Sequence, residues 1–395
     1  MQTKKIERLL GALAIATIII AWIIGANLAD KDVFPALRAA APTANHFTPS
    51  RTGYAIFGDE TENSLLGYVQ VASANGYGGP MKVVVATDLQ GKITGVSILQ
   101  HKETPLWIQK VLNTKFIKSF TGKKYSDGFQ LGKDVDGITG ATYTSRAIAE
   151  AVLKGSRQIA GTELGLAVPA ETNPRIQFGI PEIVLLGLYA LGYFGHQSKF
   201  KFTKQARWVS MIVGMVVLGF IYTSPLTISD VNKFLLGFWP AWQNHLYWYL
   251  LMGGILFVFT VDNKNPYCEW FCPFGAAQEC MGALGGAKSR SVGKYKLFLL
   301  WLQRGLAWLA ILLALLFRNP GLTSYEIFGT LFDLSGNSVQ FALLGLVLIT
   351  SLFVRRPWCT YLCPLRPVSD LYRTFRTWVI DLWKKRTVKT LASQK

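Results

Sequence analysis

Cysteine is missing from the first 267 residues of this 395-residue chain, and the whole sequence holds only five. An extracellular domain held together by disulfides needs an even set of cysteines, so this part of the chain is not such a domain. Acidic residues are also few, 23 against 41 lysines and arginines. No long low-complexity stretch and no recognisable kinase, DNA-binding or ATP-binding segment occurs, which counts against a self-sufficient signalling protein.

Half of the residues are hydrophobic although the formal net charge is +18. The hydrophobic residues gather in long uncharged runs, which indicates an integral membrane protein. A basic protein often binds nucleic acid, but here the basic residues gather between the hydrophobic runs. In that position lysine and arginine mark the cytoplasmic side of a membrane protein. The sequence therefore predicts a membrane as partner and no nucleic acid.

The first hydrophobic run, Leu9–Ala29, follows Lys4, Lys5 and Arg8. It is long enough to cross a hydrocarbon core of about 30 Å. A signal peptide cleaved after Ala29 is the alternative, but the run exceeds a typical signal-peptide core, which favours a retained anchor over residues 1–30. Both interpretations place the next segment outside the cytoplasm.

Five further runs predict membrane-spanning helices in a bundle over residues 180–356. The first of them contains Pro181 and Glu182, yet without it the basic loops would face outward. With it, the two short outer loops carry only Lys233 and Arg318, as the positive-inside rule requires. The chain is thus predicted to cross a bacterial cytoplasmic (inner) membrane about six times. The five spans are Ile180–Gly195, Trp208–Ser229, Phe234–Val261, Leu297–Phe317 and Val339–Val354.

Residues 45–165 are predicted to form an extracytoplasmic α+β domain, and residues 166–179 a linker. The strands are expected at Leu66–Ser73, Met81–Thr87 and Ile93–Leu99. The helices are expected at Thr104–Phe120 and Thr144–Ile159. The predicted fold is therefore an α-helical membrane bundle with an α+β domain inserted after the first helix.

The run from 136 to 145 reads DGITGATYTS. It resembles the flavinylation signature D-x-x-(S/T)-G-A-T, whose last threonine carries FMN through a phosphoester. Thr142 is that threonine here, at the start of a predicted helix, where free N–H groups and the helix dipole favour a phosphate. The residues that complete the motif are Asp136, Thr139, Gly140 and Ala141.

Two other segments accompany this run. Gly76–Pro80 precedes a predicted strand, and His101–Pro105 follows the next one. Taken singly, they are an ordinary turn and a solvated strand end. In this order and spacing, the three segments resemble the FMN-binding domain shared by the C subunit of Na⁺-translocating NADH:quinone reductase and the G subunit of the Rnf complex. The resemblance implies a separate flavin transferase, and Leu106 replaces a glycine that is usual in the family. The further flavin-binding residues that it implies are Gly78, Gly79, Glu103 and Thr104.

Two C-x₃-C-P motifs each follow the predicted cytoplasmic end of a span. Thiolates bind iron–sulfur clusters, and this motif is the tail of the bacterial ferredoxin run. Four thiolates can hold a 2Fe–2S or 4Fe–4S cluster, or zinc, and the duplicated motif favours iron–sulfur. Cys280 is either a fifth ligand or, as we favour, a plain core thiol. The predicted metal ligands are Cys268, Cys272, Cys359 and Cys363.

Residues 357–395 carry the second motif and then apolar residues at helical spacing flanked by basic ones, which predicts an amphipathic helix on the inner membrane face. In the membrane region only His196 and His245 are histidines, and they lie near opposite membrane faces, so they do not share one haem. His245 is an interfacial residue or a quinone contact. Arg304 either reaches the inner surface or contacts a quinone or a partner helix.

The whole layout resembles the nitrous-oxide-reductase activator family and the membrane flavoproteins associated with reductive dehalogenases. The chain ends without ferredoxin-like cysteine clusters, which makes it more similar to the shorter, dehalogenase-associated form. The resemblance implies electron transfer from quinol or a cytoplasmic donor to an extracytoplasmic reductase in anaerobic respiration.

The leading hypothesis is a transmembrane electron-transfer flavoprotein that connects a cytoplasmic-side cluster or quinol with FMN on Thr142. A redox-sensing regulatory or maturation protein is one alternative. A subunit of an ion-translocating redox complex is another, weakened by the few carboxylates in the spans. Because the hydrocarbon core is about 30 Å thick, either the cysteine loops fold back into the bundle, or a quinone, a second flavin or a partner subunit must bridge it.

Overall fold

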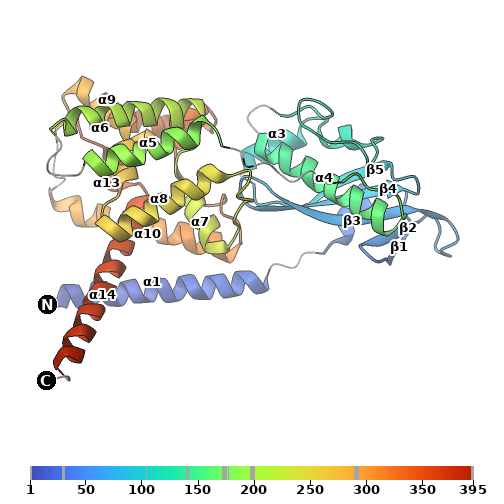
Figure 1. Cartoon of the computed structure of the whole chain (residues 1–395), viewed down its shortest axis with the longest axis horizontal. Coiled ribbons are helices and arrows are strands. Elements are labelled where there is room, and N and C mark those ends of the chain that lie inside the picture. The colour runs from blue at the N-terminus through green and yellow to red at the C-terminus, as the bar shows by residue number, and fades with distance from the viewer. Residues whose placement is uncertain are drawn as a thin grey trace. The chain divides into compact units, whose positions relative to one another are not determined.

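In the computed structural model the chain forms two compact units (Figure 1). The first comprises residues 1–173, 229–241 and 312–324, and the second comprises residues 174–228, 242–311 and 325–395. The structure describes residues 2–28, 32–103, 105–138, 142–170, 176, 178–195, 201–288 and 293–392. The described side chains exclude those of residues 2–8, 105–107, 142 and 381–392.

A five-stranded antiparallel sheet in the order β1-β2-β3-β4-β5 forms the centre of the first unit. Each strand pairs with the next one along the chain. The three predicted strands are confirmed as β3, β4 and β5. The prediction missed β1 and β2, which have only four residues each. The strands are His46–Pro49, Tyr54–Phe57, Leu65–Asn75, Pro80–Asp88 and Ile93–Gln100.

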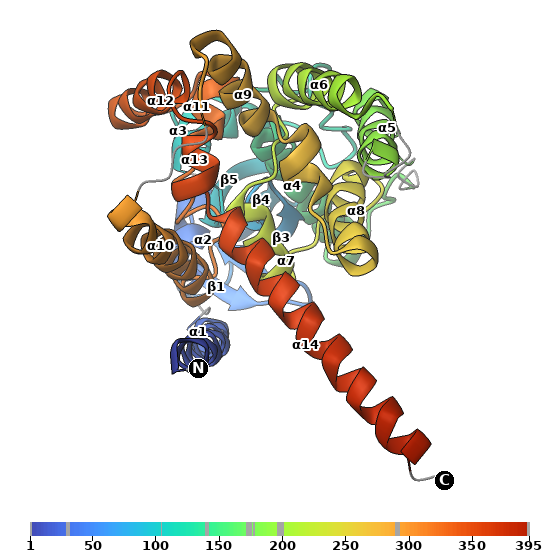
Figure 2. The same ribbon diagram turned by 90° about the vertical axis from the view of Figure 1, so that its left-hand side faces the viewer.

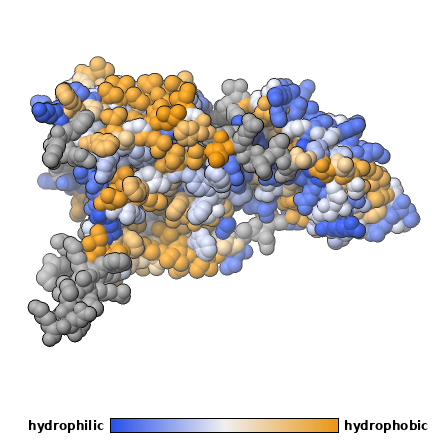
Figure 3. Space-filling view, in the orientation of Figure 1, coloured by the Kyte–Doolittle hydropathy of each residue, from blue (hydrophilic) through white to orange (hydrophobic). Residues whose placement is uncertain are grey.

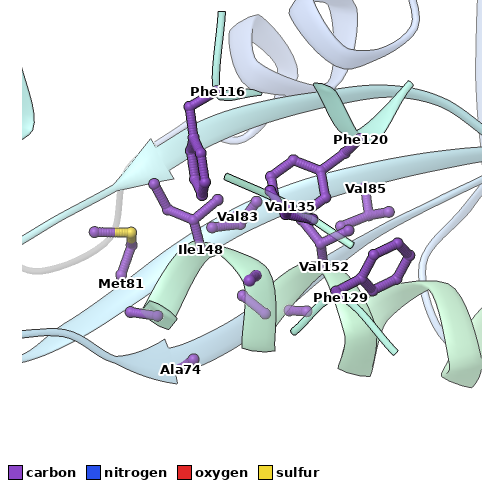
Figure 4. Packing of buried hydrophobic residues seen from close by; sticks show 14 of the residues in the cluster. Ala74, Met81, Val83, Val85, Phe116, Phe120, Phe129, Val135, Ile148 and Val152 are labelled. Atoms are coloured by element: carbon purple, nitrogen blue, oxygen red, sulfur yellow. The ribbon is translucent and has the colours of Figure 1, made fainter. Parts of the chain in front are cut away.

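Helix α4 (Thr142–Thr162) covers one face of this sheet. Val83 and Val85 of β4 belong to the same buried cluster as Ile148 and Val152 of α4 (Figure 4). All four side chains are fully buried. Burying an aliphatic side chain contributes about 1.5–3 kcal/mol. This layer therefore holds α4, and with it the residue that begins the helix, firmly against the sheet.

Helix α2 (Phe34–Ala40) covers the opposite face. Val84 and Ala86 alternate with the valines that face α4, and they are buried in a second cluster with Leu37. Successive side chains of a strand point to opposite faces. Because both faces are covered, β4 is an almost continuous apolar run rather than an alternating one. The α+β character of this part of the chain is confirmed.

The predicted helix Thr104–Phe120 is wrong in its length. The structure has helix α3 (Pro105–Leu112) and a separate 3₁₀ turn, η1 (Ile117–Phe120). Between them the Thr114 hydroxyl donates to the carbonyl of residue 111 at 2.8 Å and accepts the N–H of residue 116 at 3.3 Å. Such local side-chain bonds compete with the helical hydrogen-bond pattern.

Helix α1 (Gln2–Asn27) contains the predicted anchor. Its glycine Gly25 lies directly against the last turn of α10 (Lys296–Leu316), where a Cβ would collide with the Leu315 carbonyl oxygen. Small residues permit such close backbone approach between membrane helices. The end of α1 and the end of α10 therefore form one packed crossing within the first unit.

The second unit consists of helices. Helix α5 packs against α6 and α8, and α9 packs against η2 and α12 (Figure 2). The C-terminal segment predicted to be helical is confirmed as α14. Besides most of α10, the elements are α5 (Ile180–Gly195), α6 (Thr203–Val213), the π-helix η2 (Gly214–Ile221), α8 (Leu246–Asp262), the π-helix η3 (Tyr267–Phe271), α9 (Pro273–Gly285), η4 (Gly293–Tyr295), α11 (Phe328–Phe332), α12 (Ser338–Ser351), α13 (Pro357–Tyr361) and α14 (Leu365–Ala392).

Three helices among the described residues are long and apolar enough to cross a membrane. These are Leu9–Asn27, Thr203–Ile221 and Gly293–Leu316. Three shorter apolar helices coincide with other predicted spans, namely Ile180–Gly195, Leu246–Asp262 and Ser338–Ser351. Hydrophobic side chains cover much of the visible surface of the helical unit (Figure 3), which suits contact with lipid. That the chain crosses the membrane about six times stays a prediction.

The predicted span Phe234–Val261 is wrong as one continuous helix. Helix α7 (Ile228–Leu236) ends at Gly237, whose φ is +73°, and α8 begins only at Leu246. A glycine with positive φ is a common helix stop. Lys233, expected in an outer loop, therefore lies on a short helix of its own.

The predicted span Trp208–Ser229 also ends earlier than expected. The helix formed by α6 and η2 stops at Ile221, and Pro225 follows shortly after. The residue before a proline avoids helical backbone angles, which favours a stop in this region.

Candidate flavin and iron–sulfur sites

A buried carboxylate joins the three segments of the predicted flavin motif. Glu103 follows β5 and is 1% exposed. Its Oε1 accepts a hydrogen bond from the Gly78 N–H at 3.0 Å, and its Oε2 accepts one from the Thr144 hydroxyl at 2.5 Å. Glu103 thereby fixes the glycine loop and the beginning of α4 to the end of β5.

The surroundings of Glu103 act on its pKa in opposite directions. Burial raises the pKa above its ordinary value and outweighs the other influences. The Thr144 hydroxyl, the Gly78 and Tyr77 N–H groups and the charge of Lys233 lower it, because each favours the ionised form. Glu103 is therefore a buried group that holds its proton to a higher pH than an exposed glutamate.

The loop before β4 requires glycines, because other atoms of the protein lie too close to its backbone to leave room for a Cβ. A Cβ at Gly76 would collide with the carboxylate of Glu103, and a Cβ at Gly78 would collide with the Lys102 carbonyl oxygen. Gly79 has a φ of +141°, which side-chain-bearing residues rarely adopt. Gly78 and Gly79, two of the predicted flavin-binding residues, thus belong to a loop closed tightly around Glu103.

Thr142 is the first residue of α4, two residues earlier than the predicted start of the helix. The first-turn N–H groups of a helix have no partner within it, so they and the dipole can hold a phosphate there. Asp136 is exposed on the approach to the helix, and the Ile138 N–H donates to Ser145 Oγ at 3.4 Å. Thr104, Thr139, Gly140, Ala141 and the side chain of Thr142 lie outside the described residues.

A lysine that the sequence analysis assigned to an outer loop lies beside this site. The Nζ atom of Lys233 stands 4.3 Å from the centre of the Tyr77 ring, and the Tyr143 ring is 6.2 Å from that of Tyr77. Lys233 is 6% exposed and pairs with Asp230 at 3.1 Å. The three-residue spacing of Asp230 and Lys233 can be read from the sequence, but their position beside the flavin motif cannot. Thr144, within the recognised run, was also missed.

Both C-x₃-C-P motifs adopt a similar local arrangement in the second unit. Cys268 lies in η3 and Cys272 is the residue before α9. Cys359 lies in α13, and Cys363 stands just before α14. Proline is well suited to the first turn of a helix. The second cysteine of each motif therefore lies at a helix N-terminus, where negative charge is favoured.

The four cysteines lie near one another in the second unit. In every pair among them, the charge of one thiol raises the pKa of the other. Within the part of the chain that the structure describes, no three His, Cys, Asp or Glu side chains are close enough to hold one metal ion. Four thiolates are the donor set of a 2Fe–2S or 4Fe–4S cluster, and the four cysteines fit such a cluster in their chemistry.

Two amide side chains donate hydrogen bonds to the sulfurs. Asn265 Nδ2 donates to Cys268 Sγ at 3.1 Å, and Gln278 Nε2 donates to Cys359 Sγ at 3.2 Å. Gln278 also accepts the Trp358 N–H at 2.9 Å, which fixes the orientation of its amide. Hydrogen bonds to sulfur tune the potential of a cluster. Neither amide could be predicted from the sequence, because no spacing rule marks them.

Burial raises the pKa of all four thiols, that of Cys272 to about 11. A coordinating cation deprotonates a thiol, so bound iron would offset this burial. Cys280 is partly exposed, as Cys268 and Cys359 are, and besides burial Glu279 raises its pKa. Among the five cysteines, it is the one outside the two C-x₃-C-P motifs.

An ionic cluster connects the two motifs. Glu279 accepts from Arg207 at 2.6 Å and is paired with Arg356 at 2.9 Å and Arg355 at 3.1 Å. Arg356 also donates to the Cys268 carbonyl at 2.8 Å. These side chains line a cavity of about 720 Å³ beside the cysteine loops. This group of ion pairs holds the second C-x₃-C-P motif against the first.

Three further residues singled out in the sequence are placed by the fold. His101 follows β5, and His245 precedes α8. Arg304 of α10 stacks over the Trp301 ring at 5.1 Å. His196 lies outside the described residues. Quinone contacts at His245 and Arg304 stay predictions.

Two protein families match parts of the chain. The FMN-binding domain family matches residues 76–155, which include Glu103 and Thr142. The 4Fe-4S binding domain family matches residues 244–291 and 339–381, which include the four cysteines. The chain therefore carries an FMN-binding domain and a 4Fe-4S binding domain, and these support FMN and an iron–sulfur cluster as its cofactors.

The chain is also similar to components of redox complexes. It is 37% identical over 93 residues to the G subunit of an ion-translocating oxidoreductase complex of Vibrio vulnificus (strain YJ016), covering 21% of this chain and 44% of that protein. It is 34% identical over 138 residues to the G subunit of the complex of the same name from Stutzerimonas stutzeri, covering 33% and 50%. It is 33% identical over 103 residues to the G subunit of a proton-translocating ferredoxin:NAD(+) oxidoreductase complex of Clostridium ljungdahlii, covering 25% and 55%. The chain spans about half the length of the curated relatives it matches.

Proposed function

We propose that this protein is a transmembrane electron-transfer flavoprotein. It passes electrons between an iron–sulfur cluster held by the two C-x₃-C-P motifs and FMN joined by a phosphoester to Thr142. The observation that carries the proposal is that one chain combines an FMN-binding domain, a 4Fe-4S binding domain and helices apolar enough to cross a membrane.

At the flavin site, Thr142 provides the hydroxyl for the phosphoester, and the first turn of α4 offers N–H groups to the phosphate. Glu103 positions the glycine loop and Thr144 around this site. FMN supplies one- and two-electron chemistry when bound. The remaining residues of the proposed site are Asp136, Thr139, Gly140, Ala141, Gly78, Gly79 and Thr104.

At the cysteine site, four thiolates hold the cluster, which is of the 4Fe–4S type. Asn265 and Gln278 donate hydrogen bonds to two of the sulfurs. These bonds act on the reduction potential of the cluster.

The protein lies in a bacterial inner membrane, with the FMN domain outside the cytoplasm and the cysteine motifs on the cytoplasmic side. The positive-inside distribution of lysine and arginine supports this orientation. Quinol or a cytoplasmic donor supplies electrons, and an extracytoplasmic reductase accepts them. A quinone or a partner subunit bridges the membrane, and a flavin transferase attaches FMN.

The direct test of the flavin assignment is the Thr142→Ala variant of the full-length protein, coexpressed with a flavin transferase. Covalent flavin is measured by fluorescence of the denatured protein in a gel. Thr162→Ala, an exposed threonine at the other end of α4, is the matched control. We expect the Thr142 variant to lose all covalent flavin and the control to retain it. Covalent flavin in the Thr142 variant would overturn the assignment.

A second candidate function is a component of an ion-translocating redox complex, because the relatives named above are subunits of such complexes. The two functions differ in what the isolated protein can do. Flavin reduction by quinol in the purified protein, without ion uptake in proteoliposomes, supports the first function. Ion uptake that needs copurified redox subunits supports the second.

A further inference from the structure

Helix α7 carries a buried ion pair. Lys233 and Asp230 lie one turn apart, are 6% and 7% exposed, and approach to 3.1 Å. Removing two charges from water costs several kcal/mol per ion, which their mutual attraction rarely exceeds. Such a pair contributes little to stability by itself, so its position in the fold calls for another explanation. Neither matched family covers it, because the matches end at 155 and resume at 244.

The ammonium group of this pair faces the flavin loop. Lys233 Nζ lies 4.3 Å from the centre of the Tyr77 ring, and Tyr77 lies between the two glycines that close around Glu103. Tyr77 in turn lies 6.2 Å, ring to ring, from Tyr143, the neighbour of Thr142. The charge of Lys233 is also felt at the Glu103 carboxylate, where it favours the ionised form.

Besides Lys233, other residues of segment 229–241 also contact the glycine loop or the strand end beside it. A Cβ at Gly79 would lie 2.9 Å from the Phe238 ring. Asn75 Nδ2 donates to the Trp239 carbonyl at 3.5 Å. Several contacts thus seat α7 and the residues after it beside the glycine loop within the first unit.

From this arrangement we infer that the positive charge of Lys233 raises the reduction potential of the flavin and that the negative charge of Asp230 lowers it. The inference rests on the proposed attachment of FMN to Thr142. Two-electron reduction of a flavin near neutral pH takes up two electrons and one proton, and the isoalloxazine gains one negative charge. A buried ammonium nearby favours that charge, and a buried carboxylate opposes it, because neither is screened by water.

The test is a potentiometric titration of the full-length flavinylated protein with dithionite as reductant, followed by flavin absorbance. Lys233→Met leaves Asp230 without its counter-charge, so we expect the equilibrium constant for two-electron reduction to fall at least tenfold, a shift of about 30 mV to lower potential. Asp230→Asn should shift the potential in the opposite direction. Lys233→Arg keeps the charge and should restore most of the wild-type value.

The matched control is Lys154→Gln, which removes an exposed lysine paired with Glu150 in the same unit. Solvent screens this charge, so we expect less than a threefold change in the equilibrium constant. Covalent flavin is measured in every variant before the titration. A flavin absent from Thr142 contradicts the proposed function, whereas full flavin occupancy with an unchanged potential in Lys233→Met overturns only the inference. If Lys233→Met fails to fold, an Asp230→Asn variant without the upward shift overturns it instead.

Discussion

Replacing Thr144 with valine keeps the shape of the side chain and removes one hydroxyl donor. That hydroxyl donates to Glu103 Oε2 at 2.5 Å, and both side chains are 1% exposed. A hydrogen bond to a charged group contributes about 1.5–3 kcal/mol, and one between neutral groups about 0.5–1.5 kcal/mol. The cost of the substitution therefore depends on whether Glu103 carries its proton.

Burial raises the folded-state pKa of Glu103 above its ordinary value of 4.5. A group whose pKa is raised on folding stabilises the fold below its unfolded pKa, and this contribution is lost as the pH rises through the folded pKa. Thr144 opposes that loss because it favours the ionised form. We expect Thr144→Val to destabilise the protein by about 0.5–3 kcal/mol, and by more at pH 8 than at pH 5, because the ionised fraction of Glu103 rises with pH.

The assay is urea unfolding of the full-length protein in detergent at both pH values, followed by the fluorescence of the covalent flavin. Thr87→Val is the matched control. Thr87 is 1% exposed, and its hydroxyl has no hydrogen-bond partner among the described residues, so its loss should be neutral or stabilising. An equal cost of Thr144→Val at both pH values, or an equal cost of the two substitutions, would refute the reasoning.

Gly78→Ala should destabilise the first unit by about 1–3 kcal/mol and reduce flavin content per protein, because the new Cβ collides with the Lys102 carbonyl. Gly187→Ala, where a Cβ meets nothing within 4 Å, should leave both quantities unchanged, and equal effects would contradict the close-approach argument. Gln278→Leu should retain iron but lower the reduction potential of the cluster, because Cys359 Sγ loses its donor at 3.2 Å. A redox titration followed by EPR measures this potential, and an unchanged value would count against the role of the amide.

Much of the first unit could be predicted from the sequence. The three long strands were recognisable from β-branched runs, and the flavin run was placed at the start of a helix, although α4 begins two residues earlier, at Thr142. The two short strands were missed because four residues give too weak a pattern. The predicted helix Thr104–Phe120 failed at Thr114, where side-chain hydrogen bonds override apolar spacing.

The long-range partners of each site could not be predicted. Glu103 was recognised through a family resemblance, but its bond to Thr144 depends on how β5 and α4 meet. Lys233 was counted only as a charge in an outer loop, because nothing local connects α7 with Tyr77. The amide of Gln278 reaches Cys359 only once the second unit has folded.

The central claim is that one chain holds both a flavin and a cluster shared by the two C-x₃-C-P motifs. Its most direct test is iron content and low-temperature EPR of anaerobically purified full-length protein, before and after dithionite. We predict a reducible iron–sulfur signal that Cys268→Ala and Cys359→Ala each abolish and Cys280→Ala leaves intact. An iron-free protein with fully populated flavin, or a signal that survives both of the first two substitutions, would contradict the account.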